Sequence, residues 1–217
     1  MTENQQLLGR LSKLDSSAVS DALDSFQLKG VVTRLKQVTV PKKIWGQAVT
    51  VKLVPQDDQP SARHLGTAAV EAATSDNVIV VEHCRDDVAG WGGNLSLAAN
   101  VRGIKGVIID GACRDADEMR GIDFPVYASA VVPTTARGRI KEQSFNEKIQ
   151  IDQVEVQPGD FVLADGSGIV FIPIALADEV LTKAEAIVEN EANMAKQILE
   201  GKPVSTVMGA KYENMLK

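Results

Sequence analysis

The chain has 217 residues, a formal net charge of −6 and an isoelectric point of about 5.0. Hydrophobic residues make up 44% of it, enough for the core of one domain, and we expect a single domain over 1–217. The acidic balance argues against nucleic acid as a partner, because phosphate binding needs a basic surface. Two cysteines without a CxxC spacing argue against a disulfide framework, and no apolar run is long enough to cross a membrane. We therefore expect a cytoplasmic protein.

Two amphipathic helices are predicted at the start of the chain. Leucines recur at helical spacing over 7–14, and Asp15 offers an N-cap for a second helix that ends at Gly30. The segment 31–54 is rich in Val, Thr and Ile and is interrupted by a proline and a glycine. This composition predicts two or three strands after the two helices.

The middle of the chain mixes helices with short apolar strands. The predicted helices cover 60–73, 95–102 and 115–120. Apolar runs predict strands at 77–82, 106–110 and 125–128, the first two buried on both faces. The segment 86–93 between the first strand and its following helix is expected to be a loop.

The last third of the chain begins with strands and ends with a long helix. Alternating apolar residues predict a half-exposed strand at 149–156, and the apolar runs 161–164 and 169–172 flank a turn, which predicts a hairpin. A helix over 175–200 carries a mixed apolar stripe and ends at Gly201. The whole order predicts an α/β fold in which helices flank a mixed β-sheet and the terminal helices are free to pack on neighbouring subunits.

A glycine-rich loop precedes the predicted helix at 95–102. Gly90, Gly92 and Gly93 lead into Asn94 and Leu95. Such a turn leaves backbone N–H groups free at a helix N-terminus, where a carboxylate or a phosphate binds well. Glycines in this pattern also occur in plain loops that only cap a helix.

Arg114 and Asp115 follow a buried strand, at the position where α/β proteins place ligands. An arginine can bind a carboxylate through two parallel hydrogen bonds, and an aspartate is a hard oxygen ligand that suits Mg²⁺ or Mn²⁺. Asp117 and Glu118 add two further carboxylates. The same sequence pattern also fits a solvent-exposed helix that begins with acidic residues and carries an Arg–Asp ion pair on its surface.

Five segments together resemble the RraA-like family. They are SAVSDALD at 17–24, WGGNL at 91–95, RGIKGVIIDGACRD at 102–115, FPVYA at 124–128 and PGDFVLADGSGIV at 158–170. This family includes 4-hydroxy-4-methyl-2-oxoglutarate and 4-carboxy-4-hydroxy-2-oxoadipate aldolases and the regulator of ribonuclease E activity. The resemblance implies a fold of the swivelling β/β/α type with helical N- and C-terminal arms, and a homotrimer or a pair of trimers with sites between subunits.

The resemblance also implies roles for the central motif. Arg114 would hold the substrate carboxylate and Asp115 would bind a divalent metal, Mg²⁺ or Mn²⁺. The glycine loop would bind the rest of a pyruvate-like unit through the segment Gly92, Gly93, Asn94 and Leu95. Glu191 of a neighbouring subunit, or failing that Glu189, would support the metal through water.

These roles predict a metal-dependent (class II) lyase for small 2-oxo acids. It would cleave 4-hydroxy-2-oxo acids to pyruvate, decarboxylate oxaloacetate, or both, through a metal-stabilised enolate. One departure is Gly93, which stands where these aldolases carry an acidic residue about twenty positions before the arginine. The ribonuclease E regulators usually lack the aspartate after the arginine, which is present here as Asp115. The alternatives are a non-catalytic protein that binds ribonuclease E, and a diverged lyase or isomerase for a sugar acid.

The remaining reactive side chains have structural interpretations. The only two histidines, His64 in a predicted helix and His83 at a strand end, lack the spacing of a zinc site. Cys113 lies beside Arg114, which would lower the pKa of its thiol, but a small buried residue that packs behind the site is the favoured interpretation.

Overall fold

The computed structural model describes residues 2–59 and 63–209. Its helices are α1 (Glu3–Leu11), α2 (Ser16–Ser25), α3 (Thr67–Ala72), α4 (Gly93–Val101), α5 (Ala116–Gly121), η1 (Ile174–Leu176), α6 (Ala177–Leu199) and α7 (Val204–Val207). Its strands are β1 (Val31–Val32), β2 (Lys36–Gln37), β3 (Ile44–Pro55), β4 (Asn77–Glu82), β5 (Ala89–Trp91), β6 (Val107–Asp110), β7 (Ala112–Cys113), β8 (Val126–Ala128), β9 (Ala130–Val131), β10 (Ile140–Phe145), β11 (Ile149–Ile151), β12 (Val154–Val156), β13 (Phe161–Ala164) and β14 (Ile169–Ile172).

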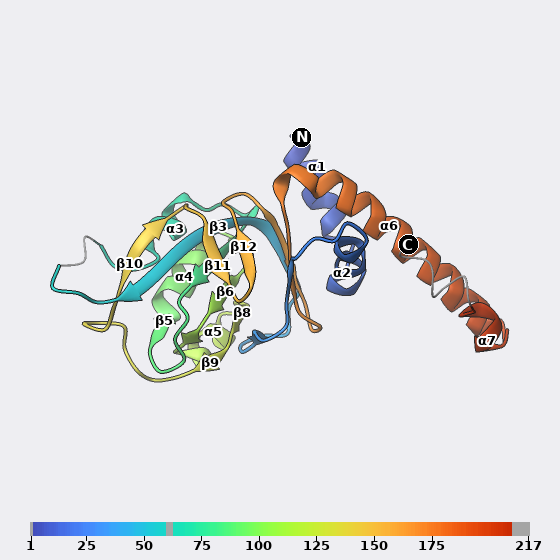
Figure 1. Cartoon of the computed structure of the whole chain (residues 1–217). Coiled ribbons are helices and arrows are strands. Elements are labelled where there is room, and N and C mark those ends of the chain that lie inside the picture. The colour runs from blue at the N-terminus through green and yellow to red at the C-terminus, as the bar shows by residue number, and fades with distance from the viewer. Residues whose placement is uncertain (1, 60–62, 210–217) are drawn as a thin grey trace.

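A mixed sheet forms the centre of the molecule (Figure 1), with the strand order β1-β14-β13-β3-β4-β6-β8-β2. β3, β4, β6 and β8 run parallel, and α3, α4 and α5 lie in the connections between them. The long strand β3 joins the parallel and antiparallel halves, because its first residues pair with β13 and its last residues pair with β10. This arrangement confirms the predicted α/β fold with a mixed sheet flanked by helices.

Both faces of the parallel strands are covered. In β4, Ile79 and Val81 face a core shared with α3, α4 and α5, whereas Val78 and Val80 face a core shared with the β11–β12 hairpin. Burial on both faces explains why this strand is an unbroken apolar run in the sequence. All four residues of β6 are likewise buried, three of them apolar and the fourth the charged Asp110.

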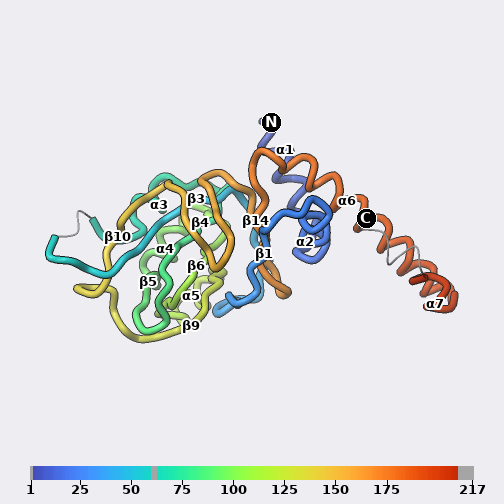
Figure 2. The backbone as a smooth tube through the Cα atoms, in the orientation of Figure 1, coloured from blue at the N-terminus to red at the C-terminus, as the bar shows by residue number. Residues whose placement is uncertain are grey.

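The terminal helices form an arm beside the sheet. α1, α2 and the first half of α6 pack on β13 and β14 through a third core, and α6 then extends away from the sheet, as the tube in Figure 2 makes plain. The buried stripe of α6 consists of Ala177, Val180, Leu181, Ala184 and Ile187, and no later residue of the helix is buried. None of the helices in the described ranges has the length and apolar content that a membrane crossing requires.

The structure corrects three sequence predictions. The helix predicted at 60–73 is α3 and begins only at Thr67, after Gly66 in a left-handed turn; residues 60–62 lie outside the described ranges. The loop predicted at 86–93 contains strand β5. The single strand predicted at 149–156 is the hairpin β11–β12, because Asp152 takes a positive φ of 53° and reverses the chain.

Candidate functional site

Three short strands form a second sheet just beyond the parallel strands. β5, β7 and β9 pair in parallel and follow the carboxyl ends of β4, β6 and β8 respectively. The connections therefore leave this small sheet at one edge of the molecule, where α/β folds place ligands. The predicted site lies on two of them.

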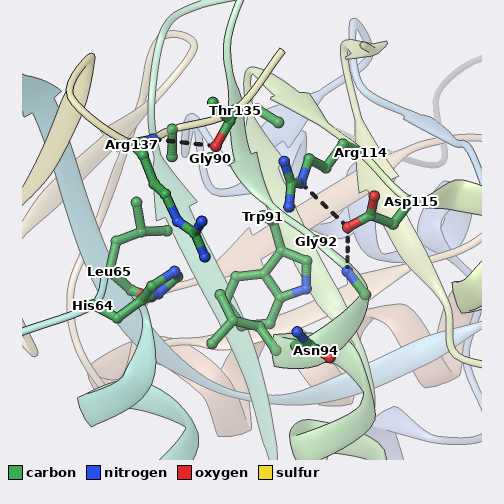
Figure 3. A pocket seen from close by; sticks show the side chains of 14 residues that line it. His64, Leu65, Gly90, Trp91, Gly92, Asn94, Arg114, Asp115, Thr135 and Arg137 are labelled. Carbon is green, nitrogen blue, oxygen red and sulfur yellow. Dashed lines mark hydrogen bonds and ion pairs between the residues drawn. The ribbon is translucent and has the colours of Figure 1, made fainter. Parts of the chain in front are cut away.

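A cavity of about 100 Å³ opens at this edge. It brings together the glycine loop, the Arg–Asp pair and a loop after β9, and its lining residues are His64, Leu65, Ala89, Gly90, Trp91, Gly92, Gly93, Asn94, Leu95, Arg114, Asp115, Thr135, Ala136 and Arg137. Figure 3 shows Arg114 and Asp115 on one side of this cavity and Arg137 and His64 on the other. All predicted residues of the glycine loop and the Arg–Asp pair thus line one cavity.

Asp115 is held in an unusual backbone conformation. It is the N-cap of α5 with φ 60° and ψ 37°. This is the left-handed region of backbone conformation, which is uncommon for residues other than glycine. Its Oδ2 accepts a hydrogen bond from Gly93 N–H at 3.1 Å and lies 3.2 Å from Arg114 Nε. Among the described residues nothing hydrogen-bonds to its Oδ1. One carboxylate oxygen is therefore fixed by the protein and the other is available to a ligand.

Arg114 is anchored at its backbone and at Nε. Its N–H donates to the Trp91 carbonyl at 3.0 Å, and its Nε contacts Asp115, while its side chain is 39% exposed. No described residue pairs with the terminal nitrogens of its guanidinium group. Those two nitrogens can form parallel hydrogen bonds to a carboxylate.

The N-terminus of α4 contributes backbone donors. Ser96 N–H donates to Gly92 O and so closes the first helical turn, which leaves the earlier amides without helical partners. Gly93 N–H is taken by Asp115. Of the four amides predicted to bind substrate, those of Gly92, Asn94 and Leu95 have no hydrogen-bond partner within the described structure.

Gly93 lies directly against Glu118. A Cβ atom added at Gly93 would collide with Glu118 Oε2 and would lie 3.3 Å from Asp115 Cβ. The carboxylate of Glu118 therefore occupies the space that a side chain at position 93 would fill. The two carboxylates of Asp115 and Glu118 both come from the start of α5 and flank the same glycine. The described residues contain no group of three or more His, Cys, Asp or Glu side chains that could hold a metal ion.

The floor of the cavity is closed by Trp91 and the residues beneath it. Trp91 is 2% exposed, and its indole Nε1 donates to Ser96 Oγ at 2.8 Å. Cys113 is fully buried, and burial raises the pKa of its thiol to about 11, so the structure favours a packing role for it. His83 is also buried and its Nε2 lies 2.6 Å from the Val88 carbonyl; burial lowers the pKa of its imidazole.

Two lining residues are not apparent from the sequence. His64 precedes α3 instead of lying in a helix, and Arg137 lies in the loop 132–139 after β9. Neither belongs to a motif, and the sequence separates them by more than seventy positions. Only the pairing of β10 with β3 brings their loops together at the cavity.

The two glutamates of α6 that were predicted to support the metal lie outside the cavity of their own chain. Glu191 and Glu189 are exposed on the part of α6 that extends from the sheet (Figure 1), and neither lines the cavity of Arg114 and Asp115. The pKa of Glu191 is raised, first by partial burial and then by the nearby carboxylates of Asp15 and Asp21. Within one chain this residue therefore faces α2 and not the candidate site.

Comparisons with known proteins agree with this architecture. The model of the RraA-like family, described as Aldolase/RraA, matches residues 16–171. Protein DlpA of Legionella pneumophila is 28% identical over 196 residues, which are 90% of this chain but 32% of that protein, so the chain spans about a third of this relative.

Two further comparisons concern an enzyme and a crystal structure. A 4-hydroxy-4-methyl-2-oxoglutarate aldolase of Thermus thermophilus is 35% identical over 82 residues, 38% of this chain and 49% of that protein. An uncharacterised protein of Pseudomonas syringae pv. tomato has a similar structure, with a TM-score of 0.85 and 29% identity over 94% of this chain and 98% of that one. The family match covers well over half of the sequence, and the chain belongs to the RraA-like family.

Proposed function

We propose that the chain is a divalent-metal-dependent lyase that cleaves small 4-hydroxy-2-oxo acids to pyruvate, decarboxylates oxaloacetate, or does both. The observation that carries this proposal is the Arg114–Asp115 pair in one cavity. Among the described residues, Arg114 offers two unpaired guanidinium nitrogens, and Asp115 offers one unpaired carboxylate oxygen beside them. A 2-oxo acid presents a carboxylate and an adjacent carbonyl, so it can use both at once. The name of the Thermus relative as an aldolase supports the same reaction class.

The chemistry of the donors fits Mg²⁺ or Mn²⁺. Magnesium keeps several of its waters and is usually bound by one or two carboxylates together with the substrate. Asp115 would hold the ion through its free Oδ1, and Glu118 provides the second carboxylate near Gly93. When bound, the metal would act as a Lewis acid on the 2-oxo group and draw electrons from the breaking carbon–carbon bond.

The chain's own groups would bind and orient the substrate. Arg114 neutralises the carboxylate, and the free amides of Asn94 and Leu95 at the start of α4 donate to substrate oxygen atoms. Trp91 closes the floor of the cavity and excludes water from below. The proposed metal-dependent reaction uses no Schiff base, and no lysine is among the described residues that line the cavity.

Asp115→Asn tests the proposal. The protein is stripped with a chelator, and pyruvate release from oxaloacetate and from 4-hydroxy-4-methyl-2-oxoglutarate is measured with and without Mg²⁺ or Mn²⁺. We expect metal-dependent turnover in the unmodified protein and a loss of about 100-fold or more in Asp115→Asn, the scale of removing one group that stabilises developing charge.

The matched control is Asp117→Asn. Asp117 is two residues away, but its side chain is 96% exposed and pairs with Arg120, so its removal should change the rate less than about twofold. Circular dichroism of both variants checks the fold. If the unmodified protein turns over neither substrate with either metal, the lyase is wrong and a non-catalytic binding protein is favoured.

A further inference from the structure

His64 lines the cavity on the wall opposite the Arg114–Asp115 pair (Figure 3). The residue is exposed, and the binding of a 2-oxo acid as described above makes no use of it. The carboxylate and the carbonyl group of such an acid would lie at Arg114 and Asp115, so the rest of the molecule extends away from this pair. C4 and its hydroxyl group then lie on the side of the cavity that His64 forms.

The hydrogen bond of the His64 ring defines its tautomer. Nδ1 lies 3.0 Å from the carbonyl oxygen of Leu65. A carbonyl oxygen only accepts hydrogen bonds, so Nδ1 carries the hydrogen atom in this contact. In the neutral imidazole the other nitrogen, Nε2, then holds a lone pair and no hydrogen. No described residue hydrogen-bonds to Nε2, which is therefore available to accept a proton from a ligand.

The backbone that carries His64 is fixed to the rest of the fold. Its carbonyl accepts from Thr67 Oγ1 at 2.7 Å, at the start of α3. Gly66 N–H donates at 2.7 Å to Oε2 of Glu142 in β10, a side chain that is only 4% exposed. Leu65, between these two anchors, is buried. The imidazole thus extends from a positioned backbone, as a group that transfers a proton requires.

The other titratable side chains in the lining have different properties. Among the described lining residues they are Arg114, Arg137 and Asp115. Arginine stays protonated in proteins and only donates hydrogen bonds. Asp115 contacts Arg114 through one carboxylate oxygen, and under the proposed function its other oxygen binds the metal. His64 is the described lining residue that remains as a base.

We infer that His64 is the general base of aldol cleavage and takes the proton of the C4 hydroxyl group through Nε2. The inference rests on the proposed function, because it places the 2-oxo acid group at Arg114 and Asp115. As Nε2 takes the proton, the electron pair of the O–H bond forms the carbonyl group of the leaving fragment. The C3–C4 bond breaks, and its electron pair passes to C3. The protonated imidazole then returns the proton to C3, which yields pyruvate and restores the neutral ring.

Decarboxylation of oxaloacetate does not need this base. C4 of oxaloacetate is a carboxylate without a hydroxyl proton, and the same C3–C4 bond breaks by release of CO₂. The neutral imidazole has no hydrogen on Nε2 at that point, so water supplies the proton to C3. Both reactions would use Arg114 and Asp115, whereas aldol cleavage alone would use His64. A comparison of the two reactions in one protein therefore isolates the role of His64.

His64→Asn tests this role. The asparagine amide nitrogen takes the place of Nδ1, and the variant has no counterpart of Nε2. We expect kcat for cleavage of 4-hydroxy-4-methyl-2-oxoglutarate to fall about 100-fold, and kcat for oxaloacetate decarboxylation to change less than about threefold. His64→Ala should behave in the same way. Because the cavity is open at the edge of the molecule, added imidazole should restore part of the aldol cleavage in His64→Ala and leave decarboxylation unchanged.

Arg63→Gln is the matched control. Arg63 precedes His64, does not line the cavity of Arg114 and Asp115, and pairs with Glu142 at 2.5 Å. Any loosening of the loop in this variant should affect both reactions, so the ratio of the two rates should stay that of the unmodified protein.

A second measurement does not depend on turnover. Titration calorimetry with Mg²⁺ present measures the binding of pyruvate, which lacks C4 and its hydroxyl group. His64→Asn should bind pyruvate as tightly as the unmodified protein does, because Arg114 and the amides of α4 hold that unit. A purely structural role of His64 would instead weaken pyruvate binding.

The two proposals fail in different ways. If the unmodified protein turns over neither substrate, the proposed function is wrong, and the role of His64 is wrong with it. If oxaloacetate is decarboxylated, the lyase stands. The role of His64 is then overturned if the unmodified protein does not cleave the hydroxy acid, or if His64→Asn cleaves it at the unmodified rate or lowers both rates equally.

Discussion

Gly93 lines the cavity and lies directly against the carboxylate of Glu118. By its resemblance to the aldolases, the sequence predicts that an acidic side chain is missing at position 93, where this chain has glycine. The structure places the Glu118 carboxylate where a side chain of residue 93 would begin. A carboxylate is therefore present beside Asp115, although it comes from α5 and not from α4. In the sequence alone, Glu118 stands out only as part of an acidic helix start.

Gly93→Asp should therefore lower activity instead of restoring it. The backbone of Gly93 is not left-handed, so aspartate fits its conformation, but its Cβ displaces Glu118 and adds a second charge beside Asp115. We expect kcat/KM on 4-hydroxy-4-methyl-2-oxoglutarate to fall about 10-fold. Adding Glu118→Ala to this variant removes the collision and should recover part of the loss, which the double-mutant cycle measures as non-additivity. An increase in activity for Gly93→Asp alone would contradict this account.

The residues of the site differ in how far the sequence reveals them. Arg114, Asp115 and the glycine loop follow predicted strands and helices directly, so their meeting follows from the parallel order of the strands. Arg137 and His64 lie in loops without periodicity and reach the cavity only through the pairing of β10 with β3. Nor does any local pattern predict that Asp115 takes a positive φ or that its carboxylate contacts Gly93 and Arg114.

Among the secondary-structure elements, length and burial decide which ones the sequence predicts. β4, β6, β13 and β14 are buried on both faces; β4, β13 and β14 appear as apolar runs of four residues, and β6 as a run of three at 107–109. β5, β7 and β9 have two or three residues each, too few for any period to be visible, yet they position the whole site. β10 is partly exposed and its alternation is broken by a bulge, so the sequence does not predict it either.

The hairpin β11–β12 depends on buried carboxylates that its own sequence does not contain. Asp110, at the end of β6, is 1% exposed; its Oδ2 accepts from Asp152 N–H at 2.7 Å and its Oδ1 pairs with Arg34. Glu82, at the end of β4, accepts from Gln150 N–H at 2.7 Å and pairs with Lys52. The carboxylates at the ends of β4 and β6 thus bind the backbone of the hairpin and fix it over the sheet. These contacts explain why the strand predicted at 149–156 folds back.

Arg34→Met tests this attachment. The change leaves the buried carboxylate of Asp110 without its cationic partner, and we expect the free energy of unfolding to fall by about 2 kcal/mol. This is below the value for a fully buried pair, because the Arg34 side chain is 40% exposed. Lys148→Met is the control, since the Lys148–Glu155 pair on the same hairpin is more than half exposed and should be worth under about 0.5 kcal/mol. Equal urea midpoints for the two variants would refute the structural role of Arg34.

At the scale of the whole molecule, the second half of α6 extends past the described core on which its first half packs. Its 23 residues span roughly 35 Å, and only the part up to Ile187 is buried against the chain's own core. The remainder carries Glu191 and exposes apolar side chains, including Leu199 at 88%. We propose that this part of α6 packs on a neighbouring subunit of a trimer, where Glu191, or failing that Glu189, supports the metal at the neighbour's Asp115.

Mixed subunits test the shared site. Asp115→Ala and Glu191→Ala should each be inactive, because each removes one half of every site. When the two are unfolded, mixed in equal amounts and refolded, a site is intact if one subunit supplies Asp115 and its neighbour supplies Glu191. Random mixing around a head-to-tail trimer gives about a quarter of the sites this composition, so about a quarter of the activity should return.

The control is a mixture of Asp115→Ala with Arg114→Ala. Both residues belong to the same half of the site, so no arrangement of these subunits makes an intact one and activity should stay absent. The same mixing is repeated with Glu189→Ala, which identifies the glutamate that acts. If refolded trimers of Asp115→Ala and Glu191→Ala form but remain inactive, Glu191 does not complete the neighbour's site. Its raised pKa, which burial and the carboxylates of Asp15 and Asp21 produce, would then belong to the packing of α6 on α2 within one chain.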